Sequence, residues 1–169
     1  RSALLTGGVK IPDALGSAIK RMVPMAKFFC HGDGCLALFN GSNEMTAPEI
    51  DALISKANDR TAPRPSATQG GFERLSAAKT VILFDAGGPP PPPFAATAHA
   101  GPLAFEMSVG RERLIVNCGS HIHSAWRAAG RPTAAHSTLT LADTNAVELV
   151  EPAGIGKRRC KVSCMRKED

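Results

Sequence analysis

The sequence predicts an α+β fold in which helices come first and an antiparallel β-sandwich follows. Apolar side chains recur with helical spacing in the first third of the chain, whereas the second half contains several short runs rich in β-branched residues. Because the two patterns are segregated rather than alternating, a βαβ fold is disfavoured. We interpret residues 1–62 as helical, the Pro-, Ser-, Thr- and Gly-rich stretch 63–76 as a linker, and 77–169 as the β-sandwich.

Two helices are expected in the first part. Residues 12–29 carry apolar side chains at i, i+4, i+7 and i+8, although Pro24 lies inside this pattern and predicts a kink or a restart near it. The second helix begins after Thr46, which has Glu49 three residues later, the spacing of a capping box.

Short strands are expected in the rest of the chain, at 35–40, 79–85, 102–108, 113–117, 136–141, 146–150 and 160–165. The turn between 102–108 and 113–117 falls at Val109-Gly110. We expect a wide loop there because Val disfavours the positive φ of a tight turn. Five consecutive prolines, 89–93, predict a stiff loop, with a ligand for an aromatic-lined domain as the alternative.

The charge balance favours acidic partners. The net charge is +5, which suits an acidic polysaccharide or a nucleic acid. Aromatic residues make up only 5% and Tyr is absent, so surfaces for stacking nucleotide bases are scarce and a nucleic-acid binder is disfavoured. No apolar run approaches the roughly 20 residues that cross a bilayer, so membrane insertion is not expected.

The cysteines do not form a recognisable framework. Their number is five, and no C-x-x-C pair occurs, which predicts free thiols that pack as small buried hydrophobes. The chain begins without Met and ends shortly after a strand-like run, so we expect a fragment that is incomplete at both ends.

The candidate site contains histidines at the predicted strand ends and in the loops. Pairing of 102–108 with 113–117 would bring His99 near the loop that carries His121 and His123. Imidazoles beside an oxygen donor such as Asn117 suit zinc, and the alternative is a set of hydrogen-bonded structural histidines.

Two further pairs of polar residues attract attention. Arg127 and Arg131 are four apart, so they would share one side of a helical turn and present two forks to carboxylate or sulfate groups, or else form a solvated face. His31 and Asp33 suit an acid–base pair, although Gly-Asp-Gly equally predicts a turn that ends a helix. The sequence contains no phosphate-binding loop and no G-x-S-x-G nucleophile elbow.

An ordered series of short motifs resembles the heparinase II/III-like family. The series runs His99-Ala-Gly-Pro-Leu-Ala-Phe-Glu, then Leu-Ile-Val-Asn117-Cys-Gly119, then Trp126-Arg127, then Thr133-Ala-Ala-His136-Ser-Thr. In the family, the corresponding series is H-x-H, D-P-G, W-R and A-H-N-T. Upstream pieces such as Phe28-Phe29-Cys30-His31-Gly-Asp33-Gly are similar to a bacterial branch, so the resemblance covers most of the chain.

The resemblance implies a fold and an activity. Family members join an α/α toroid to β-sandwich layers and cleave uronic-acid polysaccharides, such as glycosaminoglycans, by β-elimination. Residues 1–62 would then be the last toroid helices, and 77–169 would be part of the sandwich. The partner would be an acidic polysaccharide, and we expect Arg127 and Arg131 to contact either the acidic sugar or the missing toroid. The family suggests the cell envelope or periplasm, and the cytoplasm is not excluded.

The departures from the family pattern concern chemistry. The first His of H-x-H falls on Thr97, so the catalytic His of the sandwich is missing. In relatives with structural zinc, the positions of His99, Asn117 and His136 supply the ligands, and Asn here replaces Asp. The toroid segment that would carry the catalytic Tyr is absent, so we expect this chain alone to be inactive. The alternative is a non-enzymatic carbohydrate-binding or scaffolding sandwich.

Overall fold

The structure, a computed structural model, describes residues 2–8, 10, 12–120, 124–150 and 154–167. The helices are α1 (Ser2–Thr6), α2 (Asp13–Phe28), α3 (Ala47–Ala57) and α4 (Ser124–Ala129), with 3-10 turns at Pro92–Phe94 and Thr133–Ala135. The strands are β1 (Ser66–Ala67), β2 (Phe72–Ala77), β3 (Thr80–Asp85), β4 (Phe105–Val109), β5 (Glu112–Ile115), β6 (Val147–Val150) and β7 (Gly154–Arg158).

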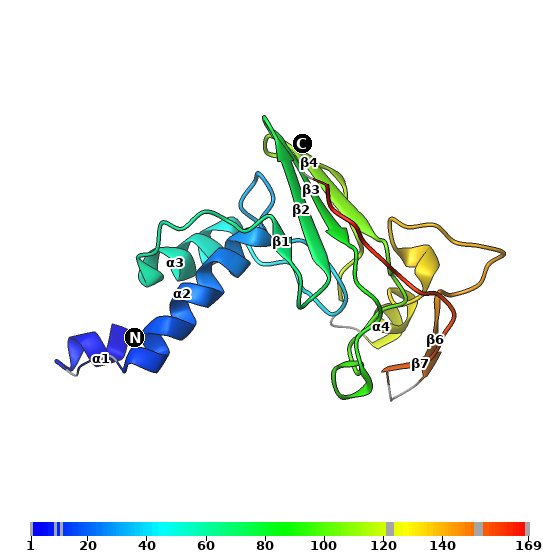
Figure 1. Ribbon diagram of the computed structural model, residues 1–169, viewed down its shortest axis with the longest axis horizontal. Helices are drawn as coiled ribbons and strands as arrows, with labels where there is room; N and C mark the ends of the chain where they lie inside the picture. The colour runs from blue at the N-terminus through cyan, green and yellow to red at the C-terminus, as the bar shows by residue number, and fades with distance from the viewer. Residues whose placement is uncertain (1, 9, 11, 121–123, 151–153, 168–169) are drawn as a thin grey trace.

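The elements are arranged along one axis. Helices α1–α3 lie at one end, a five-stranded sheet lies in the middle, and α4 with the β6–β7 hairpin lies at the other end (Figure 1). The sheet has the order β1-β2-β3-β4-β5 with every neighbouring pair antiparallel. The predicted α+β class, with helices followed by antiparallel strands, is confirmed. No helix among the described residues is long and apolar enough to cross a membrane.

The helical predictions are confirmed, with one correction. Helix α2 continues through Pro24 to Phe28 without restarting, and Pro24 is buried in it. At the start of α3, the backbone N–H and the hydroxyl of Thr46 both donate to Glu49 Oε2 at 2.8 Å, and the predicted capping box is formed.

The core forms where the end of α2 and the loop after it pack on the sheet. It combines Phe28, Ala37, Phe39, Leu83 and Ala104, of which Phe28 and Leu83 are fully buried. Leu83 comes from the central strand β3, whose alternate side chains face this layer. The core therefore joins the helical part to the sheet.

One arginine of the sheet also caps helix α2. Arg74 of β2 donates from Nη1 to the carbonyls of Phe28 and Cys30, at 2.7 and 2.8 Å. Carbonyls at a helix C-terminus have no partner within the helix, and a cation there also opposes the negative end of the helix dipole. Arg74 therefore fixes the end of α2 on β2.

The structure differs from the predicted linker at 63–76. Strand β1 and most of β2 lie within this stretch, and β2 pairs with β3 over its whole length from Phe72 to Ala77. Glu73 and Arg74 interrupt the apolar pattern, but hydrogen bonding to β3 decides the conformation.

Three predicted strands are not formed. Residues 35–40 contribute only a single bridge between Cys30 and Leu36, 136–141 contribute only a bridge from Leu141 to Thr144, and 160–165 are irregular. His99 and His136 consequently lie in loops rather than at the start of strands. These segments are apolar enough for strands but have no neighbouring strand that satisfies their backbone groups.

Other local predictions have mixed outcomes. The β4–β5 turn is tight rather than wide, because Val109 stays in the strand opposite Glu112 and Gly110 takes the positive φ of 58°. The prolines form a loop that ends in the first 3-10 turn, as predicted. All five cysteines are free, as predicted, but none is buried, because Cys118 and Cys164 are exposed and the other three are half-buried.

Candidate functional site

A buried hydrogen-bond network joins the loop after α2 to strand β4. Glu106 is completely buried, and its Oε2 lies 2.8 Å from His31 Nε2. Its Oε1 accepts hydrogen bonds from Leu38 N at 2.8 Å and from the backbone and side-chain nitrogens of Asn117 at 3.1 Å each. Glu106 therefore joins the loop after α2 and the segment after β5 to strand β4.

The other side of the His31 ring is also occupied. Its Nδ1 lies 3.0 Å from the hydroxyl of Ser108, which in turn accepts a 3.4 Å hydrogen bond from Gly32 N. Asp33 instead accepts from Arg113 Nε at 2.7 Å and from Cys35 N at 2.9 Å. His31 and Asp33 thus do not form an acid–base pair, and the alternative interpretation as a turn is correct, with Gly34 N bonded to His31 O.

His99, Asn117 and His136 meet at the far side of this network. The two imidazole rings lie 5.2 Å apart between centroids, and His136 Nδ1 is 3.3 Å from Asn117 Oδ1. Gly101 makes room for the His136 ring, since a Cβ there would lie 2.8 Å from its Cγ. The structure therefore brings the three predicted zinc ligands together.

Two ring nitrogens of this cluster have no partner. Among the described residues, His99 Nδ1 and His136 Nε2 are buried without a hydrogen bond. Burial, together with the neighbouring His136 and Arg131, lowers the pKa of His99 to about 4. Burial also lowers the pKa of His136, and the nearby backbone of Arg131 partly opposes this change. Both rings are accordingly neutral and able to accept a ligand at neutral pH.

These donors fit a metal ion only in part. Two unpartnered imidazole nitrogens suit zinc, but Asn117 Oδ1 already accepts from Ser137 N at 3.2 Å. No group of three or more His, Cys, Asp or Glu side chains that would hold a metal occurs in the part of the chain that the structure describes. The site thus offers two nitrogen ligands, from His99 and His136.

The two predicted arginines are separated. Arg131 is buried and donates from Nε to Ala98 O at 3.3 Å and from its terminal nitrogen to Gly154 O. Arg127 is exposed on α4. Arg131 is thus positioned to hold the loop before His99, whereas Arg127 is accessible from solvent. His121 and His123 lie outside the described residues.

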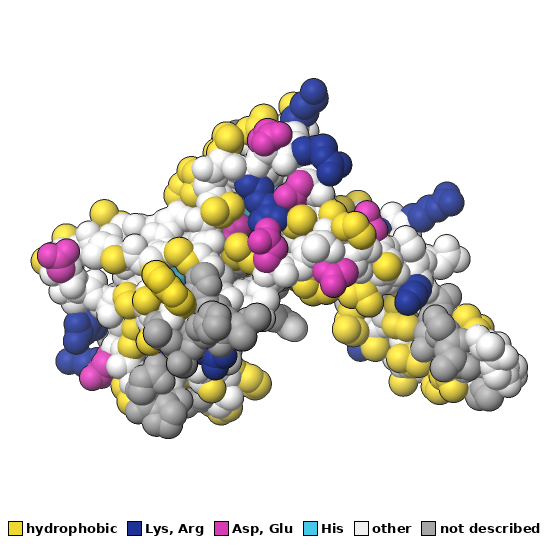
Figure 2. All heavy atoms as spheres, turned by 180° about the vertical axis from the view of Figure 1, so that it is seen from behind, with side chains coloured by type: hydrophobic (Ala, Val, Ile, Leu, Met, Phe, Trp, Pro, Cys, Tyr) yellow, Lys and Arg dark blue, Asp and Glu magenta, His cyan; other side chains and the backbone are white. Residues whose placement is uncertain are grey.

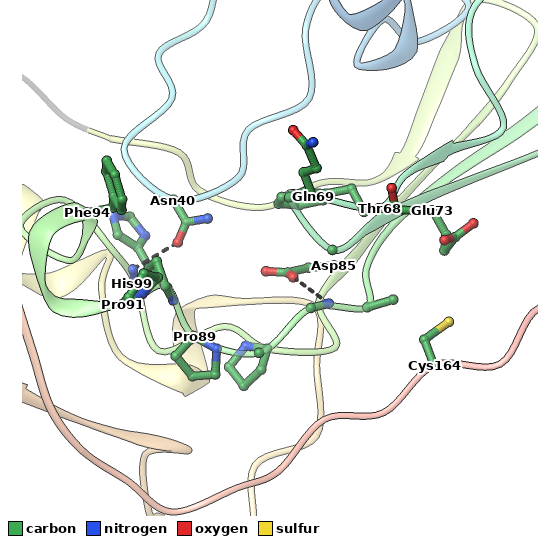
Figure 3. A pocket seen from close by; sticks show the side chains of 18 of the residues that line it. Asn40, Thr68, Gln69, Glu73, Asp85, Pro89, Pro91, Phe94, His99 and Cys164 are labelled. Atoms are coloured by element: carbon green, nitrogen blue, oxygen red, sulfur yellow. Dashed lines mark hydrogen bonds between the residues drawn. The ribbon is translucent and has the colours of Figure 1, made fainter.

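An open pocket of about 650 Å³ lies at the edge of the sheet, between the β1–β2 turn, the end of β3 and the proline loop. Asp85 at the end of β3 and Asn40 from the loop after α2 extend toward its centre, with Phe94 and Pro89 at its side (Figure 3). Asn40 Oδ1 accepts from the backbone N–H of His99 at 3.0 Å, so one wall connects both parts of the chain.

Asp85 has an unusual environment for a carboxyl group. Burial raises its pKa to about 7, and only a 3.3 Å hydrogen bond from Gly87 N opposes this change. Perturbed carboxyl groups in pockets are frequent at functional sites. Sequence reasoning did not select Asp85, although the turn-forming Gly87-Gly88 directly after a strand is a signal for a side chain at a strand end.

Glu106 and Asn40 were also missed. Glu106 falls in an alternating strand pattern where an acidic side chain normally faces solvent, so its burial is visible only from the partners around it. Asn40 precedes Gly41 and has a φ of 51°, which is typical of Asn in turns. The Asn-Gly pair was therefore the available signal.

Comparison with known proteins identifies the class. The model of the heparinase II/III-like C-terminal domain matches residues 59–169, and the chain belongs to this family. Among solved structures, the heparinase III BT4657 gene product superposes with a TM-score of 0.63 at 18% identity, covering 85% of this chain and 26% of that one. The heparan sulfate lyase HepC from Pedobacter heparinus gives 0.61 at 19% identity, covering 81% and 26%. At such identities the likeness concerns the fold.

A curated relative is more similar in sequence. The chain is 35% identical over 146 residues to FtsZ-localized protein C of Caulobacter vibrioides, covering 85% of this chain and 25% of the relative. The chain thus spans about a quarter of the length of the proteins it matches.

Replacing Glu106 tests the buried network. Glu106→Ala leaves Leu38 N, the Asn117 amide and His31 without their shared partner, so we expect a loss of about 3–5 kcal/mol in the free energy of unfolding. Glu106→Gln retains an acceptor and should cost about 1–2 kcal/mol. Urea denaturation measures both, with the exposed Glu112→Ala of β5 as the control. Equal stability of Glu106→Ala and Glu112→Ala would contradict the role of Glu106.

Asp85 predicts a pH dependence of stability. Its pKa is about 7 in the folded state and about 3.9 in an unfolded chain. Between these values the folded state binds more protons, so Asp85 lowers stability as pH rises through this window. The free energy of unfolding of Asp85→Asn should therefore rise relative to that of the parent as the pH increases from about 4 to about 8. The expected rise is on the order of 2 kcal/mol after allowance for partial exposure. Denaturation at several pH values measures this, with Asp143→Asn as a matched control, and a constant difference would contradict it.

Proposed function

We propose that the whole protein carrying this chain binds acidic polysaccharide and cleaves it by β-elimination beside a uronate. In this proposal the chain supplies the sandwich side of the substrate cleft, and toroid residues outside it supply the catalytic groups. The observation that carries the proposal is the hydrogen bond from His99 N to Asn40, which joins the loop after α2 to the sandwich at the wall of an open pocket.

Elimination sets requirements that this chain does not meet by itself. The uronate carboxylate must be neutralised, a base must remove the C5 proton, and an acid must protonate the leaving oxygen. Thr97 stands at the family's catalytic His position, where it is exposed beside Gly41, and the chain has no Tyr. The isolated chain is therefore proposed to be inactive.

The charges of the visible surface agree with a shared site. Lys and Arg side chains are interspersed with Asp and Glu on the face shown in Figure 2, rather than gathered in one basic patch. The described residues on that face form no single basic track for a polyanion, and Arg127 is proposed to contribute contacts together with the preceding toroid. The family resemblance favours the cell envelope as the compartment.

The lyase proposal is tested with heparan sulfate and other uronate polysaccharides. The whole protein should generate unsaturated uronate ends, measured by their ultraviolet absorbance, and the 169-residue chain alone should generate none. Arg127→Ala should reduce the rate roughly threefold to tenfold through lost substrate contacts, with Arg64→Ala as a charge-matched control. Cleavage by the isolated chain, or none by the whole protein, would contradict the proposal.

A catalytically silent binding or scaffolding module is the second candidate. Thr97 and Asn117 both depart from the lyase pattern, and the curated relative is named for localisation with FtsZ rather than for an enzymatic activity. This candidate predicts polysaccharide or protein binding by the whole protein without any unsaturated ends. The absorbance assay therefore separates the two candidates.

We also propose a structural role for the histidine cluster, with His99 Nδ1 and His136 Nε2 as the ligands if zinc binds. Zinc would supply a cross-link between the two loops. His136→Ala should lower stability by about 1–3 kcal/mol because it removes a half-buried ring that packs on Gly101. Thermal unfolding measures this, and elemental analysis measures zinc, with Cys118→Ser as the control. An unchanged melting temperature would contradict the role of His136, and equal zinc in parent and variant would contradict the ligand assignment.

A further inference from the structure

The pocket presents one hydrogen-bond donor and one acceptor that are both held in place. The carbonyl oxygen of the Asn40 side chain is engaged by His99 N, and no partner for its Nδ2 occurs among the described residues. The side chain therefore cannot rotate freely, and its NH2 group extends into the pocket toward the side where Asp85 lies (Figure 3). Asn40 thus offers a fixed donor.

Asp85 supplies the acceptor. Its carboxyl group receives a single 3.3 Å hydrogen bond, from Gly87 N, and no ion pair to it occurs among the described residues. Glu73, the other acidic residue of the pocket, is already paired with Arg166 at 3.0 Å. A half-buried carboxyl group with so few partners is costly, and a ligand with hydroxyl or N–H donors would remove that cost.

Apolar rings surround these two polar groups. Phe94 is 74% exposed although it is a large hydrophobic residue, and Pro89 and Pro91 line the same pocket. Flat apolar rings beside a few convergent polar groups are typical of small-molecule sites. The ligand should therefore combine an apolar face with an edge that both donates and accepts hydrogen bonds.

We propose that this pocket binds an uncharged pyranose ring, whose neighbouring hydroxyl groups bond to Asp85 and Asn40 while its C–H face packs on the Phe94 and proline rings. The pyranose site deepens the proposed function, because the choice of a glycan as the ligand rests on that function. It assigns the uncharged sugar unit, rather than the uronate, to this part of the surface. The ionised form of Asp85, to which no ion pair occurs among the described residues, would repel a uronate carboxylate or a sulfate group here.

A cationic ligand fits less well. An ammonium group would bond to Asp85 but would leave the Asn40 donor without a partner. Because burial raises the pKa of Asp85 to about 7, part of the population is protonated at neutral pH. A hydroxyl group can bond to either form of the carboxyl, whereas an ammonium group needs the ionised form.

Binding of methyl β-D-glucopyranoside to the whole protein tests the proposal, with glucuronate and methylammonium as charged comparisons. Saturation-transfer NMR and titration should show binding of the glucoside and much weaker binding of both charged compounds. Asp85→Asn should weaken glucoside binding roughly fivefold to tenfold and improve glucuronate binding, because the charge is lost. Asn40→Asp keeps the bond to His99 and loses the donor, so it should weaken the glucoside similarly. Asp143→Asn, outside the pocket, is the matched control.

The outcomes are distinguishable from those of the lyase test. No glucoside binding by the parent, an unchanged affinity in Asp85→Asn, or tighter binding of methylammonium than of the glucoside would overturn the pyranose site. Glucoside binding that is lost in Asp85→Asn, in a protein that neither binds nor cleaves acidic polysaccharide, would support the pyranose site and contradict the proposed function alone. Cleavage of acidic polysaccharide without glucoside binding would support the proposed function and contradict the pyranose site.

Discussion

The interaction on which the rest of the structure depends is the buried contact between Glu106 and His31. A carboxyl group without solvent is stable only when its oxygens are fully hydrogen-bonded, and those of Glu106 reach His31, Leu38 and Asn117. Because these partners come from the loop after α2 and from the segment after β5, that single requirement fixes how the helical part meets the sheet. Apolar packing alone would tolerate small shifts there.

The polar sites at the junction inherit their geometry from this contact. Asn117 is bonded to Glu106 on one side and lies next to His136 on the other, so the histidine cluster is aligned by the network. The loop from His31 to Asn40 is held at Leu38, which places Asn40 against His99 and at the wall of the pocket. A family fold is thus combined with a site whose shape depends on a few polar contacts.

Much of the fold was predictable from local patterns. The capping box at Thr46, the strand at β3 and the β4–β5 hairpin follow from side-chain chemistry within a few residues of one another. The motif series around His99, Asn117 and His136 also predicted correctly that these three residues meet. The predictions failed at β2 and at 136–141, where the presence or absence of a neighbouring strand decides the conformation.

The sequence by itself determined the α+β class, the positions of α2, α3 and the central strands, and membership of a family with an ordered set of motifs. Only the tertiary structure decided that Glu106 is buried, that Arg131 bonds to backbone carbonyls, and that Asp85 and Asn40 share a pocket. The physical reason is that periodicity and turn chemistry act between near neighbours. Burial and the pKa of a carboxyl group depend on atoms that long-range folding brings close.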